Sequence, residues 1–215
     1  MSSGVPPVPP GVKPLREQYE AVTRRTILQA ARELFAERGY AATPIRLLAQ
    51  RSGVAVQTVY ATFGSKAGVL QGMPDLVDEE AGVYELIVEL DLAQEPARLL
   101  AVYARLRRQI RERCSDVIRI LRSGAAVDAD IAATLADGMR RRRFGLKRLM
   151  ERLAASHALM DGVSIDRATD IASAILCDEV FDILVEQGTW SLDDYESWTT
   201  STLGTLLLRE PAVPQ

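Results

Sequence analysis

The chain has 215 residues, a mass of 23.6 kDa and a formal net charge of −3, and apolar residues make up 47% of it. This length suits one large domain or two small ones, and the apolar share is ample for a buried core. No run of about twenty uncharged apolar residues occurs, which argues against a membrane span. Residues 1–14, MSSGVPPVPPGVKP, lack the apolar stretch of a signal peptide, so we expect a cytoplasmic protein with a disordered, proline-rich tail.

The net charge conceals opposite charges in two parts of the chain. Residues 15–70 hold eight Lys/Arg against four Asp/Glu, whereas residues 71–215 hold seventeen against twenty-five. A basic segment joined to an acidic one suits a protein that presents one surface to a nucleic acid, because the field at a surface depends mainly on nearby charges. Chance asymmetry of charge would produce the same division, so a sequence motif is needed to distinguish it from nucleic-acid binding.

The first predicted helix runs from about Tyr19 to Arg38. Its apolar residues Ile27, Ala31, Leu34 and Phe35 recur at helical spacing and form one stripe, and Gly39 follows as the expected stop. The pattern predicts an amphipathic helix that buries this stripe against whatever follows it in the chain.

Residues 43–66, TPIRLLAQRSGVAVQTVYATFGSK, predict two short helices at about 44–51 and 55–61. Thr43 suits the N-cap and Pro44 the first helical position, and Gly53 supplies the left-handed conformation that closes a short turn. Leu48 faces inward, and Val54 and Val59 are spaced to pack back onto it. The second helix then presents an outer face, of the kind that helix–turn–helix proteins place in the major groove of DNA: Val56, Gln57, Thr58, Tyr60 and Thr62.

The segment from Tyr19 to Leu70 resembles the DNA-binding domain of the tetracycline-repressor (TetR) family of bacterial regulators. The matching strings are TILQAARELFAERGYAAT at 26–43, IRLLAQRSGVAVQTVYATF at 45–63 and GSKAGVL at 64–70. The resemblance implies an all-α protein with a three-helix DNA-binding domain at 15–70. A helical domain for effector binding and dimerisation would follow at 71–210.

Contacts to double-stranded DNA are expected from side-chain chemistry and from these positions. Arg46 can reach a guanine edge or a phosphate, and Gln57 can bond adenine bidentately. Lys66, at a helix start, would hold a phosphate. For Val56 and Thr62 a plain surface role is an equal alternative. The full set of expected contacts is Arg24, Arg25, Thr43, Arg46, Val56, Gln57, Thr58, Tyr60, Thr62 and Lys66.

A fourth helix is predicted to begin near Ser65, a good N-cap. In the family this helix generally continues unbroken into the second domain, whereas Gly72 and Pro74 interrupt it here, which leaves the coupling between the domains open. About nine helices and no strand are predicted, the later ones at about 75–91, 95–112, 115–123, 128–156, 166–187 and 191–208.

The resemblance also implies a homodimer, in which the last two long helices pair with their copies in a four-helix bundle. Two helix–turn–helix units would grip more phosphates than one and would recognise a palindrome. Plain core is the alternative for the apolar residues of these helices. The expected interface residues are Ile171, Ile175, Val180, Ile183, Leu184, Trp198, Leu203 and Leu206.

By the same resemblance, the second domain would bind a small effector of unknown identity that changes DNA binding. Each candidate pocket residue has a core role as its alternative: Tyr84, Tyr103, Met139, Phe144, Met150 and Trp190. The charge run Arg140–Arg143 with Lys147 and Arg148 is either a solvated helix surface or a contact to an acidic effector or to DNA.

Nothing in the sequence indicates an enzyme, a cofactor or a metal site. His157 is the only histidine, and Cys114 and Cys177 lack metal-ligand spacing and suit reduced thiols. We therefore expect a sequence-specific repressor that a small molecule releases from a palindromic operator. The alternatives are a nucleoid-type protein that binds DNA without specificity, and an all-α ligand carrier or enzyme whose helix–turn–helix is vestigial.

Overall fold

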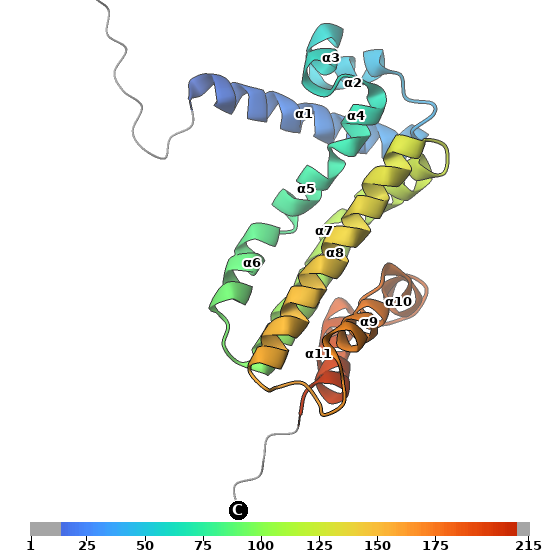
Figure 1. The fold of residues 1–215 in the computed structure, drawn as a ribbon. Coiled ribbons are helices and arrows are strands. Elements are labelled where there is room, and N and C mark those ends of the chain that lie inside the picture. Colours follow the sequence, from blue (N-terminus) through green and yellow to red (C-terminus); the bar gives the residue numbers. More distant parts are fainter. Residues whose placement is uncertain (1–13, 210–215) are drawn as a thin grey trace, which may run out of the picture.

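The computed structural model describes residues 14–209, and apart from one isolated bridge between Leu159 and Leu208 all their regular structure is helical (Figure 1). The expected all-α fold is confirmed, while most of the predicted tail at 1–14 lies outside the described residues. The elements are α1 Leu15–Arg38, α2 Ile45–Ser52, α3 Val56–Phe63, α4 Lys66–Gln71, α5 Met73–Glu80, α6 Val83–Leu92, α7 Pro96–Ala125, α8 Ala129–Ala155, α9 Ile165–Ile175, α10 Asp178–Phe181, a π-helical turn Asp182–Glu186 and α11 Leu192–Leu207.

Four of the later predicted segments differ from the helices that the structure shows. The segment at 75–91 is divided into α5 and α6, because Gly82 adopts the left-handed φ of 63° between them. The two segments at 95–112 and 115–123 form the single helix α7, in which only Cys114 departs from helical geometry, with φ −133°. The segment at 166–187 is broken after Ile175 and ends in the π-helical turn.

The N-terminal helices share a core with the body of the protein. Ile27, Leu34 and Leu48 are buried in the same cluster as Val117 of α7 and Ile131 of α8. Leu70 of α4 packs so closely on α7 that a Cβ built at Gly124 would lie 2.5 Å from its Cδ2 atom. The connector is interrupted at Gly72, as the sequence suggested, yet Met73 at the start of α5 is fully buried. Packing, rather than a continuous helix, therefore holds the two parts together.

The body is built around α7, with α8 lying beside it along most of its length (Figure 1). The helix α6 lies on one side of this pair, and α9 to α11 lie on the other. A second buried cluster, which includes Leu100, Tyr103, Leu149, Ala172 and Leu203, joins these helices. Within residues 14–209 no helix is long and apolar enough to cross a membrane.

Candidate DNA-binding surface and interior cavity

The turn between α2 and α3 has the geometry that its residues predict. Gly53 is left-handed, with φ 70° and ψ 20°, and the N–H group of Val54 donates to the carbonyl of Ala49 at 3.1 Å. Leu48 and Val59 are fully buried between the two helices. These local contacts fix the orientation of α3, so its opposite face points outward.

The outer face of α3 carries polar groups that the rest of the chain leaves available. Tyr60 is 50% exposed and Val56 36%, and Gln57 is exposed as well. Across residues 14–209, neither the side-chain amide of Gln57 nor the hydroxyl of Tyr60 has an intramolecular hydrogen bond. Thr58 and Thr62 are half-buried, and Thr62 Oγ1 donates to the carbonyl of Thr58 at 2.8 Å. The hydroxyl proton of Thr62 is thus already used inside the helix.

The two exposed arginines of α2 differ in their surroundings. Arg46 has no ion pair to any part of the chain that the structure describes. Arg51, by contrast, pairs with Glu33 at 2.8 Å and Glu37 at 3.3 Å, both on α1. The segment 38–74 is free of acidic residues in sequence, but α1 supplies acids in space that pair with Arg51, whereas Arg46 keeps an uncommitted guanidinium.

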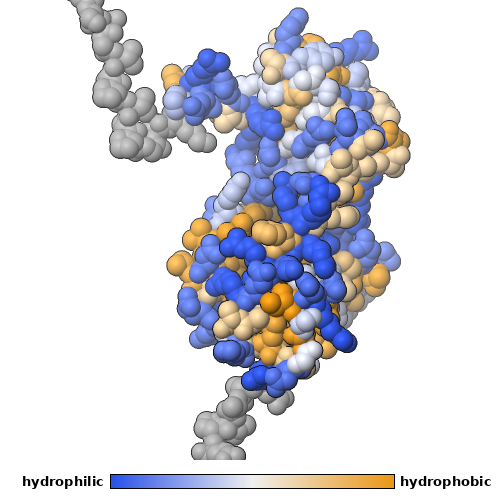
Figure 2. Space-filling model, in the orientation of Figure 1, coloured by the Kyte–Doolittle hydropathy of each residue, from blue (hydrophilic) through white to orange (hydrophobic). Residues whose placement is uncertain are grey.

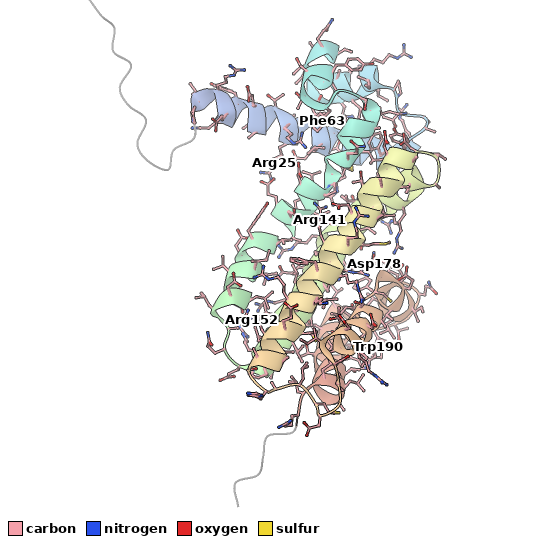
Figure 3. The ribbon with its side chains drawn as sticks, in the orientation of Figure 1. Arg25, Phe63, Arg141, Arg152, Asp178 and Trp190 are labelled. Atoms are coloured by element: carbon pink, nitrogen blue, oxygen red, sulfur yellow. The ribbon has the colours of Figure 1, made fainter. Side chains whose placement is uncertain are left out.

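The arginines of α1 that were expected at the DNA backbone pair with α5. Arg24 lies 2.8 Å from Asp75 and also lies over the ring of Phe63, and Arg25 lies 2.6 Å from Glu79 (Figure 3). All four side chains are at least 40% exposed, so water screens these pairs strongly. A phosphate would have to compete with these carboxylates for the two guanidinium groups.

Lys66 is held by the loop that precedes α2. Its Nζ atom donates to the carbonyl of Tyr40 at 2.9 Å and lies 4.3 Å from the centre of the Tyr40 ring. Ser65 caps α4 as predicted, with its side chain accepting from the N–H group of Gly68. The ammonium group of Lys66 thus joins the start of α4 to the loop that holds Tyr40.

The prediction that Thr43 contacts DNA is wrong. Its side chain is fully buried, and its Oγ1 atom donates to the carbonyl of Gly39 at 2.9 Å, so it cannot reach DNA. It is not the N-cap of α2 either, because the helix begins at Ile45 with Pro44 at the cap position. The tertiary fold turns this hydroxyl toward the end of α1.

Arg32 was not singled out from the sequence, yet it anchors α1 to the body. Its guanidinium lies 2.5 Å from Glu80 of α5 and 2.5 Å from Asp116 of α7, and it also donates to the carbonyl of Arg113. Burial by itself would raise the pKa of Asp116, but the hydrogen bonds and charge of Arg32 outweigh it and lower that pKa. One arginine in an amphipathic helix gives no sequence signal for such a role.

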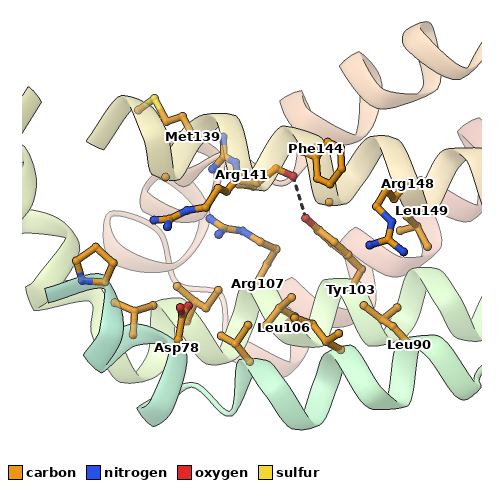
Figure 4. Close-up of a pocket in the computed structure, with 18 of the residues that line it drawn as sticks. Asp78, Leu90, Tyr103, Leu106, Arg107, Met139, Arg141, Phe144, Arg148 and Leu149 are labelled. Carbon is orange, nitrogen blue, oxygen red and sulfur yellow. Dashed lines mark hydrogen bonds between the residues drawn. The ribbon is translucent and has the colours of Figure 1, made fainter. Parts of the chain in front are cut away.

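A cavity of about 500 Å³ lies in the body, between α5 and α6 on one side and α7 and α8 on the other (Figure 4). Four of the six expected pocket residues line it: Tyr84, Tyr103, Met139 and Phe144. The other two do not. Met150 is fully buried in the core, and Trp190 packs edge-on against Trp198 on the α9–α11 side of α8 (Figure 3).

The cavity wall also carries charged residues: Arg141, Arg142 and Arg148 belong to the charge run for which an acidic effector was one interpretation, whereas Asp78, Arg107 and Asp178 were not predicted. Arg107, one helical turn after Tyr103 on α7, lies 2.7 Å from Asp178 at the start of α10. Tyr103 donates its hydroxyl hydrogen to the carbonyl of Arg142 at 3.3 Å. Across the cavity, burial raises the pKa of Asp78, although the nearby charge of Arg141 acts in the opposite direction. The spacing of Tyr103 and Arg107 would have placed both on one helix face.

The expected dimer residues are distributed between surface and core. Ile183 is 59% exposed and Leu206 44%, whereas Leu203 is 1% exposed and packs inside the second core cluster. Leu203 is therefore corrected to a core residue, since a partner subunit cannot reach it. The remaining five are half-buried: Ile171, Ile175, Val180, Leu184 and Trp198.

Comparison with known proteins identifies the class. Residues 27–73 match the model of the bacterial regulatory proteins of the tetR family, so the resemblance is confirmed and the chain carries the family's DNA-binding domain. Together with the fold, this domain supports a DNA-binding transcriptional regulator of the TetR family. No curated protein matches the sequence.

Several solved structures share the fold of nearly the whole chain. The protein in the SmeT–triclosan complex is 20% identical, with a TM-score of 0.71 over 90% of this chain and 98% of that one. A candidate transcriptional regulator from Saccharomonospora viridis, in complex with choline, is 18% identical, with a TM-score of 0.70 over 88% and 100%. The regulator FadR from Bacillus subtilis, in complex with stearoyl-CoA, is 16% identical, with a TM-score of 0.69 over 85% and 98%.

Proposed function

We propose that this protein is a cytoplasmic, homodimeric repressor that binds a palindromic operator and is released from it by a small-molecule effector. The observation that carries the proposal is the outer face of α3 with the adjacent Arg46. There Gln57 and Tyr60 are exposed, Arg46 is unpaired among the described residues, and the segment contains no acid. Such a face can offer donors to bases and phosphates without first breaking an internal bond.

Within this face the residues have different roles. Arg46 and Gln57 contact base edges, where bidentate hydrogen bonds distinguish guanine and adenine, and Val56 meets a thymine methyl group. Thr58 and Tyr60 contact phosphate oxygens and fix the register, and Thr62 joins them only by giving up its bond to the Thr58 carbonyl. Arg24, Arg25 and Lys66 contribute phosphate contacts at the edge of the face, once DNA competes with their internal partners.

The apolar face of the C-terminal helices supports the proposed homodimer. Ile183 and Leu206 are largely exposed, and Ile171, Ile175, Val180, Leu184 and Trp198 are only half-buried in one copy of the chain. Covering these groups with a second copy would remove apolar surface from water and would place two α3 helices on one duplex.

The cavity is the proposed effector site. Its volume falls within the range of roughly 300–1,000 Å³ that is usual for small-molecule pockets, and structurally similar regulators hold choline, triclosan or stearoyl-CoA. The Arg107–Asp178 pair links the cavity wall to α10, which lies in the segment proposed for dimerisation. A ligand that prefers one arrangement of this wall would shift the spacing of the two α3 helices.

Selection of bound duplexes from a random-sequence DNA pool tests the DNA-binding part. We expect an inverted repeat to be enriched by the native protein and lost with Tyr60→Ala. Tyr84→Ala is the matched control, because it removes an exposed tyrosine from the body, where DNA should not reach. Binding that is steeply salt-dependent but selects no sequence would favour a nucleoid-type protein. No DNA binding at low salt from a folded dimer would favour a ligand carrier or enzyme.

A further inference from the structure

The cavity has an apolar mouth and an interior that bears positive charge. Around the mouth, Tyr84 and Ile87 of α6 face Met139 and Phe144 of α8, and each of the four side chains is at least 44% exposed. Figure 2 shows apolar side chains gathered on this face of the body. Exposed apolar groups around an opening are suited to the hydrocarbon part of a ligand.

Further in, positive charge exceeds negative charge on the wall that α7 and α8 form. Arg107 and Arg142 both line the cavity, and both depend on the single carboxylate of Asp178, at 2.7 Å and 4.0 Å. Arg122 shares the same carboxylate at 3.1 Å from outside the cavity. Arg122 also has Glu179 and Asp182 as partners, so the surplus positive charge rests on Arg107 and Arg142, which share one carboxylate at the cavity wall.

Arg107 also has an unfilled hydrogen bond. The residue is only 7% exposed, and its Nε–H group is buried without an acceptor. Leaving a donor of a charged group unpaired in the interior is costly, and a turn of this side chain toward a ligand oxygen in the cavity would remove that cost. Two other arginines, Arg105 and Arg111, have buried Nε atoms of the same kind, but neither lines the cavity.

We propose that the cavity binds an amphipathic organic anion, with its carboxylate at Arg107 and Arg142 and its hydrocarbon tail toward the mouth between α6 and α8. The carboxylate accepts from the guanidinium groups of Arg107 and Arg142 and neutralises the surplus charge beside Asp178, while the tail covers the exposed apolar groups. This proposal rests on the proposed effector function and specifies the chemical class of its ligand.

A cationic ligand is the competing class, because Asp78 and the aromatic rings of Tyr84 and Phe144 also line the cavity. Asp78 lies near the guanidinium of Arg141, however, and a ligand cation would be repelled by this arginine and by Arg107. The anion is therefore the better match to the wall as a whole.

Calorimetric titration of the full-length dimer, without DNA, tests the class with three probes that share one tail: decanoate, decanol and decyltrimethylammonium. We expect decanoate to bind about tenfold more tightly than either of the others, as a charge-assisted hydrogen bond would give. Arg107→Gln and, as a milder change, Arg142→Gln should remove this preference. Arg143→Gln is the matched control, because Arg143 pairs with Asp170 and does not line the cavity.

The possible results separate this inference from the proposed function. Tighter binding of decanol or of the ammonium probe, or binding of no probe, would overturn the anionic class, and so would an undiminished preference in Arg107→Gln. Release of labelled DNA is measured separately. Selective binding of decanoate without DNA release would support the anion site and contradict the effector function. DNA release by the ammonium probe would support the effector function and contradict the anion site.

Discussion

The N-terminal helices and the body use the same residue type in opposite ways. On α2, Arg46 is exposed and has no ion pair within residues 14–209. On α7, Arg107 and Arg111 are at least nine-tenths buried and pair with Asp178 and Asp182 of the segment that follows α9. Arg111 also lies over the ring of Phe181.

The difference shows what determines whether an arginine of this protein is paired within the structure or left free for an external anion. Where a neighbouring helix supplies a carboxylate, the guanidinium becomes part of the structure, as it does for Arg32 and Arg51. Where no neighbour does, the group stays available for an external anion. Exposed arginines without an ion pair to any described residue also occur on the body, among them Arg119 and Arg167, so availability marks the proposed DNA-binding face only together with the acid-free helix–turn–helix segment.

The largest expected effect comes from removing a structural arginine of the body. Arg111→Ala should lower the free energy of unfolding by about 2 to 3 kcal/mol, because it removes the closer and more buried of the two arginines that pair with Asp182 and also removes packing on Phe181. Urea unfolding followed by circular dichroism measures this loss. Arg140→Ala is the control, since the pair of Arg140 with Asp137 is largely exposed, and equal losses in both variants would contradict the distinction.

Loss of the available arginine should leave stability nearly unchanged and weaken DNA binding instead. Arg46→Ala should cost about 1–3 kcal/mol on the selected operator and relax the preference at one base pair. Fluorescence anisotropy with the operator and with single-base variants of it measures both effects. An equal loss on every sequence would mean that Arg46 contacts only phosphate.

Arg25 lies between these two cases, because its pair with Glu79 is half exposed. Arg25→Gln should change stability by less than about 0.5 kcal/mol. It should weaken binding to all sequences alike and reduce the dependence of log K on log salt by about one unit. An unchanged salt dependence would show that Glu79 retains Arg25 when DNA is bound.

The smallest effect concerns an acid without an ion pair among the described residues. Burial raises the pKa of Asp78, so the folded state binds this proton more tightly than the unfolded state, and this contribution to stability falls as pH rises through the folded pKa. Asp78→Asn should therefore be slightly more stable than the native protein at neutral pH, and the advantage should vanish in acid. Urea unfolding at both pH values checks the sign, and a loss of stability at neutral pH would contradict it.

Much of the N-terminal domain could be predicted because its signals are local. Pro44, Gly53 and the spacing of Leu48 and Val59 each act within a few residues, so the turn and the outward face of α3 follow from short-range sterics and periodicity. The same rules erred at Thr43, because its burial depends on how the end of α1 packs against it.

The cavity shows the opposite situation. Tyr84 and Phe144 were expected to line a pocket, and they do. Met150 and Trp190 were expected on the same grounds, but they lie elsewhere. Asp78, Arg107 and Asp178 reach the cavity from three helices, α5, α7 and α10. No spacing along the chain brings them together.

The amino-acid sequence was thus sufficient for the all-α class, the helix–turn–helix and the outward face of α3 that is proposed to contact DNA, because those features depend on backbone preferences and on apolar periodicity over short distances. The tertiary structure alone decided which arginines are paired, where Thr43 and Leu203 point, and which charges line the cavity. Ion pairing and burial depend on groups that lie far apart in the chain, and only the packed helices determine those distances.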